Sequence, residues 1–253
     1  MCLIAFAVNA HPRYRLVMAA NRDEFHARPT AVAGFHADDG NIYGGRDLRV
    51  GGSWLSLSRR GRVVAVTNVR VGQPEVGQRS RGALVHDWVR SPAPLDLQIE
   101  RLRQDAAEYG RFNLLAFDAL RMCVLGNHPQ FSASSIDSGV HALSNAGLNT
   151  PWPKTLALRA AMSRWIQSGV DDPRALFDAL HDPQVAADAE LPDTGIGLAH
   201  ERLLSAAFIR GREYGTRAST VVLMDAQELR CIEHTFGPEG VSAGRTDVRI
   251  RLG

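Results

Sequence analysis

Residues 2–9 read CLIAFAVN and residues 14–21 read YRLVMAAN, and these two stretches decide how the chain begins to fold. The first is too continuously apolar to be half exposed, so it predicts a buried strand. The second has a similar pattern, and only a short turn containing Pro12 separates the two. Two apolar strands joined by such a turn predict an antiparallel hairpin.

Outward from this hairpin, the chain alternates between further hairpins and groups of helices. Hairpins are predicted at residues 53–57 with 62–68, 112–117 with 122–125, and 219–224 with 230–233, with single strands at 140–143 and 246–252. Helices are predicted at 153–167, 173–181 and 199–209, and as a pair within 80–107 that is broken at 91–94. Hairpins at both ends with helices grouped between them predict an α+β layered fold.

Two local signals refine this outline. The glycine pairs Gly44-Gly45 and Gly51-Gly52 mark turns or places where two backbones approach closely. Asp172 precedes Pro173, and this order predicts Asp172 as the N-cap of a helix with proline in its first turn.

Bulk composition excludes several classes of protein. The chain has 253 residues, of which 45% are hydrophobic and 22% charged, and we predict a single domain over 1–253. A net charge of +2 gives no electrostatic footprint for nucleic acid. No apolar run is long enough to span a bilayer, and no basic segment precedes the apolar start, so we expect a cytoplasmic protein without a transmembrane segment.

The cysteines, histidines and glycines show no metal or nucleotide motif. Cys2, Cys123 and Cys231 form no CxxC pair, which argues against a disulfide framework and a thiolate zinc site. Cys123 and Cys231 lie mid-strand and are predicted to be core residues. The nine histidines lack HxxxH or HExxH spacing, and neither GxGxxG nor a P-loop occurs, so we expect no metal and no cofactor required for catalysis. The histidines of predicted helices are expected on helix surfaces: His86, His181 and His200.

Cys2 is the first residue that could carry chemistry. Removal of Met1 would make it N-terminal, with a thiol and a free α-amine on one residue. The α-amine has an unperturbed pKa of about 7.7–8.0, so it can take the thiol proton and act as a built-in base. The alternative is a small buried cysteine in a first strand.

The tetrapeptide Asn21-Arg22-Asp23-Glu24 closes the second strand, beside the strand that bears Cys2. Asp23 could accept a hydrogen bond from the ammonium group of Cys2, and Arg22 could lower the pKa of its thiol. In an extended strand these neighbours point to opposite faces, so both reach one side only through a bulge or turn. The alternative is a solvated polar strand end.

Three more polar residues follow or precede apolar strands. Asn68 ends VVAVTN and Asn145 ends HALSN, and two rigid amides at strand ends suit an oxyanion hole. Arg217 precedes the strand at 219–224 and could stabilise an anionic intermediate or bind a carboxylate. The alternatives are asparagines that cap strands and turns, and a surface arginine in an arginine-rich chain with Lys154 as its only lysine.

Taken together, six motifs make the chain resemble the NRDE family, which includes the transport and Golgi organisation protein 2 homologues. They are MCLIAFAV, AANRDEF, GGSWLSLSRRGRVVAVTNVR, SRG, HALSNAGLNTPWPKT and YGTRAST, spread over residues 2 to about 235. That family is in turn similar to N-terminal nucleophile hydrolases of the bile-salt hydrolase and penicillin V acylase type. The implied fold is a four-layer αββα sandwich of two antiparallel sheets with helices on the outer faces.

The resemblance also implies roles for the site residues. It makes Cys2 the nucleophile, with Asp23 orienting its amine and Arg22 tuning its thiol. It assigns oxyanion binding to Asn68 and Asn145 and support of the charge to Arg217. The acylases separate their arginine and aspartate by intervening residues, whereas Arg22 and Asp23 are adjacent here.

Two functions follow as hypotheses. The first is a cysteine amidohydrolase that cleaves a linear carbon–nitrogen bond of an acyl-type, small-molecule substrate through a thioester. The second is a ligand-handling protein without turnover, for which the resemblance implies haem as cargo or an acyl-coenzyme A in lipid homeostasis. The altered Arg22–Asp23 spacing favours the second. A scaffold function has little support, because no coiled-coil heptad or proline-rich motif is present.

Overall fold

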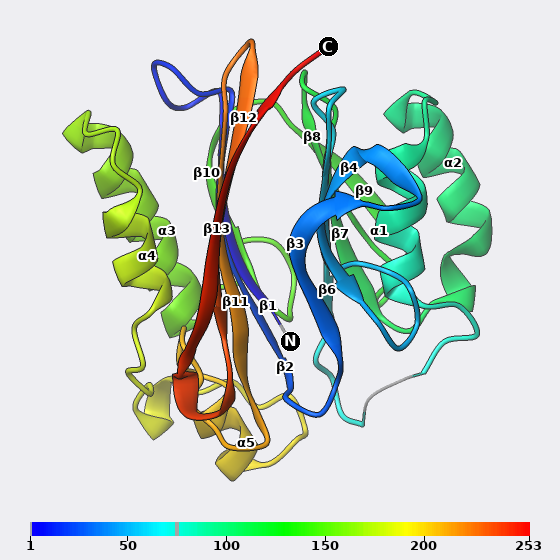
Figure 1. Cartoon of the computed structure of the whole chain (residues 1–253). Coiled ribbons are helices and arrows are strands. Elements are labelled where there is room, and N and C mark those ends of the chain that lie inside the picture. The colour runs from blue at the N-terminus through cyan, green and yellow to red at the C-terminus, as the bar shows by residue number, and fades with distance from the viewer. Residues whose placement is uncertain (1, 74–75) are drawn as a thin grey trace. The chain divides into compact units, whose positions relative to one another are not determined.

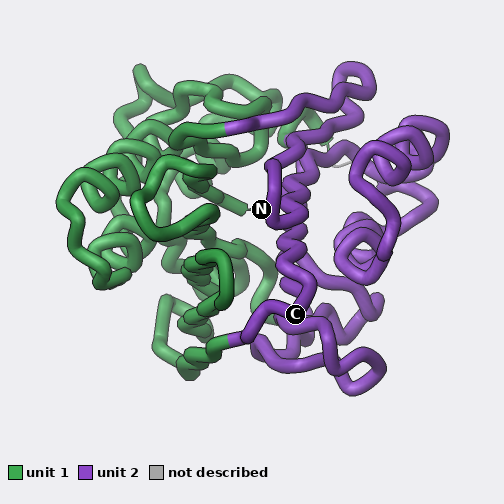
Figure 2. The backbone as a smooth tube through the Cα atoms, turned by 90° about the horizontal axis from the view of Figure 1, so that it is seen from above, with its two compact units in different colours: residues 1–27, 70–73, 138–249 green, residues 28–69, 74–137, 250–253 purple. Residues whose placement is uncertain are grey.

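The structure is a computed structural model that describes residues 2–73 and 76–253. Met1, whose removal the predicted chemistry requires, lies outside the described residues, as do Pro74 and Glu75. The described chain divides into two compact units (Figure 2). Unit 1 comprises residues 1–27, 70–73 and 138–249, and unit 2 comprises residues 28–69, 74–137 and 250–253.

Unit 1 is built on a six-stranded sheet that contains the hairpin predicted from the first residues. The strand order is β10-β1-β2-β11-β12-β13. β1 pairs antiparallel with both β10 and β2, and β2 pairs antiparallel with β11. The strands are β1 (Cys2–Val8), β2 (Leu16–Phe25), β10 (Gly139–Leu143), β11 (Tyr214–Met224), β12 (Glu228–Phe236) and β13 (Ser242–Arg251).

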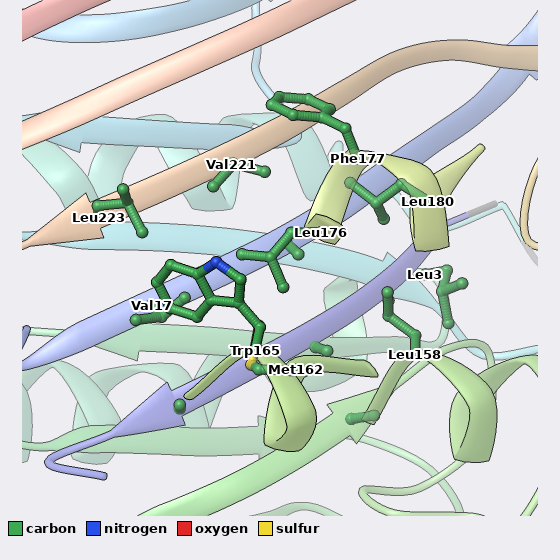
Figure 3. Close-up of a cluster of buried hydrophobic side chains, with 14 of the residues drawn as sticks. Leu3, Val17, Leu158, Met162, Trp165, Leu176, Phe177, Leu180, Val221 and Leu223 are labelled. Carbon is green, nitrogen blue, oxygen red and sulfur yellow. The ribbon is translucent and has the colours of Figure 1, made fainter. Parts of the chain in front are cut away.

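Helices α3 (Pro153–Ser168) and α4 (Arg174–Leu180) cover one face of this sheet (Figure 1). Apolar residues recur on α3 at three- and four-residue spacing, so one side of the helix is buried. Figure 3 shows three of them, Leu158, Met162 and Trp165, directed at the sheet. Burial of this helix face, rather than helix propensity, holds α3 in place.

Side-chain alternation along β1 separates the two faces of the sheet. Leu3, Ala5 and Ala7 belong to the cluster beneath α3, whereas Ile4 and Phe6, at the alternate positions, do not. Cys2 has the parity of Ile4 and Phe6, so it lies on the face opposite α3.

Unit 2 contains a seven-stranded antiparallel sheet in the order β3-β4-β5-β6-β7-β8-β9. Helices α1 (Arg81–Arg90) and α2 (Leu95–Asp105) pack against it around a core that includes Trp88 and Leu102. The strands are β3 (Thr30–His36), β4 (Asp39–Asp47), β5 (Leu55–Ser58), β6 (Val63–Asn68), β7 (Phe112–Phe117), β8 (Met122–Gly126) and β9 (Ser132–Ile136).

The glycine pairs mark close backbone approach, as predicted. A Cβ atom on Gly44 would lie 2.6 Å from the carbonyl oxygen of Leu55 on the neighbouring strand. A Cβ atom on Gly52 would collide with the backbone of Gly82 at the start of α1. Only glycine therefore lets β4 and the loop before β5 pack at these two positions.

Several predicted boundaries are wrong. The helix predicted at 199–209 is α5 (Leu198–Leu203), because residues 204–209 leave the helix and hydrogen-bond elsewhere: Phe208 donates to the carbonyl of Asp182. α4 begins at Arg174 with Pro173 as its N-cap, although the Asp172 carboxylate still accepts from the Arg174 N–H at 3.0 Å. β3, β4 and β9 were not predicted, since glycine and polar residues interrupt any apolar alternation there.

The α+β class of two antiparallel sheets flanked by helices is confirmed. Cys123 and Cys231 are buried in their strands, as predicted. Within the described residues, no helix combines the length and the apolar character that crossing a membrane requires.

Candidate active site

Cys2 is the first residue of β1, which lies between β10 and β2 in the sheet of unit 1. Its side chain is 7% exposed, and it pairs directly with Arg22 of β2. On its other side, the pairing with β10 ends at Ile4 and Leu143, and Ser144 and Asn145 follow in a bend. The hydroxyl of Ser144 lies 3.0 Å from the carbonyl oxygen of Cys2, so the chain does stay alongside β1 here.

Arg22 lies on the same face of the sheet as Cys2, because directly paired residues of antiparallel strands project to one side. Its side chain is buried, and the guanidinium lies 3.9 Å from the carboxylate of Glu24, two residues along the same face. The Arg22 guanidinium acts to lower the pKa of the Cys2 thiol. Burial nevertheless outweighs this effect and raises the pKa of the thiol, so the tuning of Cys2 by Arg22 stays a prediction.

Asp23 lies on the opposite face, where α3 packs. It is 1% exposed, and its Oδ1 accepts a hydrogen bond of 2.7 Å from the hydroxyl of Thr216, its partner on β11. The same hydroxyl accepts from the Ile209 N–H at 2.9 Å, which fixes its orientation. β2 stays extended through Arg22 and Asp23, so no kink brings the two side chains to one face.

Asn21 shares the face of Asp23 but has a structural role. Its amide nitrogen donates to the carbonyls of Leu180 at 2.7 Å and Ala207 at 2.8 Å, and its Oδ1 accepts from the Ser219 hydroxyl at 2.6 Å. These bonds tie the end of α4 and the segment after α5 to the middle of the sheet.

Arg217 occupies a β-bulge in β11. The register with β2 shifts between Thr216 and Ala218, so Arg217 is the extra residue on its strand. Its Nη1 donates to the carbonyl oxygens of Phe25 at 3.0 Å and His26 at 3.3 Å, at the end of β2. Its guanidinium is close enough to Arg22 for the positive charge to lower the pKa of Arg217, in addition to the larger effect of burial.

The two asparagines belong to different units. Asn145 is fully buried in unit 1, and its carbonyl accepts from the Arg70 N–H at 2.7 Å. Asn68 ends β6 of unit 2, where it pairs with Phe112 and is half-buried. Five of the six predicted residues therefore lie in unit 1, at the end of the sheet where β1 begins, and Asn68 lies in unit 2.

Burial dominates the electrostatics of this region. It raises the pKa of the Cys2 thiol, and the Asp23 carboxylate acts in the same direction. Burial also raises the pKa of Asp23, whereas Lys154, the Thr216 hydrogen bond and Arg22 all oppose that increase. Each charged form therefore depends on neighbours that offset the loss of hydration.

Lys154 and Tyr214 belong to this group, although neither was predicted as a site residue. Lys154 of α3 is 5% exposed, and its ammonium donates to the Leu204 carbonyl at 2.7 Å. Tyr214 begins β11, and burial raises the pKa of its phenol, with Asp23 and Cys2 adding to the effect. The one signal for Lys154 in the sequence is its being the only lysine of an arginine-rich chain.

The described residues contain one group that could hold a metal ion: His36, Asp38 and His86 of unit 2, whose ligand atoms lie within 4.8 Å of one another. Arg46 forms two hydrogen bonds with the Asp38 carboxylate, at 2.7 and 3.1 Å, and Arg90 lies 3.3 Å from it. Two guanidinium groups already neutralise this carboxylate and would repel a dication. The group is therefore better described as an ion-pair network.

The predicted surface positions of two histidines are wrong. His86 is half-buried against His36, with ring centroids 5.9 Å apart. His181 is half-buried at the end of α4, where the rings of Phe208 and Phe236 meet it edge-on. His200 is exposed, as predicted.

Comparisons with known proteins find relatives that match almost the whole chain. The family model described as Transport and Golgi organisation 2 matches residues 1–238. The chain is 33% identical over 249 residues to a Transport and Golgi organization protein 2 homolog of Bos taurus, covering 89% of each chain. It is 32% identical over 246 residues to the Homo sapiens homolog, with 89% of each chain covered.

The fold of this chain is also similar to that of a solved structure with little sequence identity. A mutant of the conjugated bile acid hydrolase from Clostridium perfringens superposes with a TM-score of 0.53 at 7% identity, covering 97% of this chain and 92% of that chain. At this level of identity the likeness shows the fold alone, which is that of the N-terminal nucleophile hydrolases.

Proposed function

The chain belongs to the Transport and Golgi organisation 2 family, and we propose that it is a cysteine N-terminal nucleophile amidohydrolase. Its substrate would carry a linear amide bond to an acyl group. Cys2 would be the nucleophile once Met1 is removed, with its own α-amine as the base. A solved protein of the same fold is named a conjugated bile acid hydrolase, which adds to the case for this class of reaction.

One observation carries the proposal: polar and charged groups from β2 and from the segment after β10 lie beside the first residue of β1. Arg22 is directly opposite Cys2, Asp23 occupies the next position along β2, and Ser144, which precedes Asn145, donates its hydroxyl to the Cys2 carbonyl at 3.0 Å. Buried polar groups cost free energy unless they are partnered, so their concentration at one strand end favours a functional role over a packing role.

The adjacent Arg22 and Asp23 fit this mechanism when each serves a different group of Cys2. The thiol projects to the face of Arg22, whose charge favours the thiolate. The α-amine is a main-chain group in the plane of the sheet, so Asp23 can approach it from the other face. Arg22 on one face of the sheet can therefore serve the thiol of Cys2, while Asp23 on the other face serves its α-amine.

The reaction balances with water as the only co-reactant. The thiol passes its proton to the α-amine as the sulfur bonds to the amide carbon, and Asn145 would bind the oxyanion. Collapse of this intermediate breaks the C–N bond, and the amine product leaves with the proton. Water then attacks the thioester, releases the acid and restores the thiol.

The test begins with the N-terminal mass of the purified full-length protein. We then expect N-acyl amides of graded chain length to be hydrolysed, and an electrophilic acyl probe to label the N-terminal peptide. Cys2→Ala should lower kcat/KM by about 1000-fold or more, because it removes the nucleophile. Cys123→Ala is the matched control, since this cysteine is equally buried in unit 2 and should leave kcat/KM unchanged.

Two results would overturn the mechanism. The first is an active protein that retains Met1 completely, because its Cys2 nitrogen would be an amide without basicity. The second is full activity in Cys2→Ala.

Ligand handling without turnover is the second candidate, and one observation favours it. Burial raises the pKa of the Cys2 thiol, and a protonated thiol on the same face as the Arg22 guanidinium suits an anionic ligand better than catalysis. The Cys2→Ala variant should then bind haem or a long-chain acyl-coenzyme A as tightly as the wild type. Binding no tighter than to a non-specific control protein would remove this candidate.

A further inference from the structure

Lys154 has an unusual position for a lysine. It is the only lysine in the sequence, it sits on α3, and it is 5% exposed. A lysine is almost never buried unless it is paired. Its one hydrogen bond to Leu204 uses one of the three donors of an ammonium group and gives it no counter-charge.

The carboxylate on the same side of the sheet is Asp23. α3 packs against β1, and both Asp23 and its partner Thr216 project toward the helix-covered face. The Leu204 carbonyl that holds Lys154 belongs to the segment 204–209, and this segment also contacts Thr216 through Ile209. Asp23 and Lys154 are thus fixed by the same short piece of chain.

Arg22, another side chain that lowers the pKa of Asp23, points to the other face of the sheet. Its guanidinium lies 3.9 Å from the Glu24 carboxylate. Thr216 provides a hydrogen bond but no charge. Among side chains, Lys154 has a larger electrostatic effect on Asp23 than Arg22 has.

We propose that Lys154 is a positioning residue of the candidate site, whose ammonium group keeps the buried Asp23 carboxylate ionised so that this carboxylate can hold the α-amine of Cys2. The role of Asp23 in holding the α-amine rests on the proposed function, whereas the effect of Lys154 on the ionisation of Asp23 does not. Lys154 touches neither substrate nor nucleophile in this role, and it acts only through Asp23.

The reverse effect is consistent with the proposal. Burial lowers the pKa of Lys154 to about 8, and the Asp23 carboxylate opposes that decrease. Each of the two groups thus favours the charged form of the other. The other ionisable groups that act on Asp23 or Lys154 come from several elements: Cys2 of β1, Arg22 of β2, Arg70, Glu201 of α5 and Tyr214 of β11.

The experiment measures the ionisation of Asp23 directly, by NMR titration of full-length protein labelled with ¹³C at the aspartate carboxyl carbon. Asp23→Asn identifies the signal. In Lys154→Gln, which keeps a hydrogen-bond donor but loses the charge, the titration midpoint of Asp23 should rise by about one pH unit or more. That is a roughly tenfold weaker acid. Lys154→Arg, which keeps the charge, should leave the midpoint close to that of the wild type.

A purely structural role for Lys154 gives a different result. If the residue only binds the Leu204 carbonyl, Lys154→Gln lowers the melting temperature but leaves the Asp23 midpoint unchanged, and the inference is wrong. If Lys154→Arg does not fold, the comparison of Lys154→Gln with wild type still decides the question.

The pH profile of hydrolysis separates this inference from the proposed function. With turnover, the acidic limb of kcat in Lys154→Gln should move to higher pH by the same amount as the NMR midpoint, with KM little changed. If the Asp23 midpoint shifts but no variant hydrolyses any amide, the effect of Lys154 on Asp23 holds and the proposed function is wrong. If the protein hydrolyses amides but the midpoint does not shift in Lys154→Gln, the proposed function holds and the role of Lys154 is wrong.

Discussion

At the scale of single residues, neighbouring positions of β2 have different roles, one structural and two in the candidate site. Asn21 donates to two carbonyls outside the sheet, whereas Arg22 pairs with Cys2 and Asp23 accepts from Thr216 on the other face. Alternation along a strand could be predicted from the sequence, and it correctly separates Arg22 from Asp23. The partners of Asn21 and Asp23 could not be predicted, because they come from α4, the segment after α5 and β11, about 160–200 residues away, whose placement depends on tertiary packing.

Replacing Asn21 with aspartate tests its structural role without changing its size. The two hydrogen bonds to Leu180 and Ala207 would be lost, and a carboxylate oxygen would face two carbonyl oxygens. We expect Asn21→Asp to lower the free energy of unfolding by roughly 3 kcal/mol, measured by urea denaturation. Ser219→Ala, which removes only the bond to Oδ1, should cost about 1 kcal/mol. An aspartate variant as stable as wild type would contradict this interpretation.

At the scale of elements, helix α3 shows what a periodic pattern can predict. Its predicted span, 153–167, differs from the observed Pro153–Ser168 by one residue, because its apolar spacing is regular. β3 and β4 were not predicted, because their strand character comes from pairing with each other and with β5 and not from apolar alternation. Regular burial on one face of an element produces a periodic apolar pattern in the sequence, whereas pairing between polar strands produces no such pattern.

Two leucines on α3 provide a matched pair for testing how far packing holds this helix. Leu158 is 1% exposed in the core of unit 1, whereas Leu156 is 46% exposed on the same helix. Leu158→Ala should lower the free energy of unfolding by about 2–5 kcal/mol, because it leaves a cavity between α3 and the sheet. Leu156→Ala should change it by about 0.5 kcal/mol or less. Equal effects in thermal or urea unfolding would contradict the packing argument.

At the scale of the whole molecule, buried histidines make the free energy of unfolding depend on pH. Burial lowers the pKa of six of them: His11, His26, His36, His86, His181 and His234. In the unfolded chain the pKa of histidine is about 6.5, so near and below that pH the unfolded chain binds more protons than the folded chain. The stability that neutral histidines contribute is therefore present above pH 6.5 and is lost as the pH falls.

We accordingly expect the free energy of unfolding to decrease steadily from pH 7 to pH 5 in urea titrations at constant salt. His234→Gln should reduce the slope, because His234 stacks on Phe177 with ring centroids 4.1 Å apart and resists protonation there. His200→Gln, at an exposed position, should leave the slope unchanged. Stability that is constant or increases over this range would show that other groups dominate.

The position of β2 between β1 and β11 has a consequence for biosynthesis. β1 is available at once, but β11 emerges from the ribosome only about 190 residues later. At translation speeds of about 5–20 residues per second, one edge of an apolar strand stays open for roughly 10–40 s in every newborn molecule. During that interval a nascent chain is exposed to pairing with the wrong strand, so we expect its yield in cells to depend on chaperones that bind while translation is still in progress.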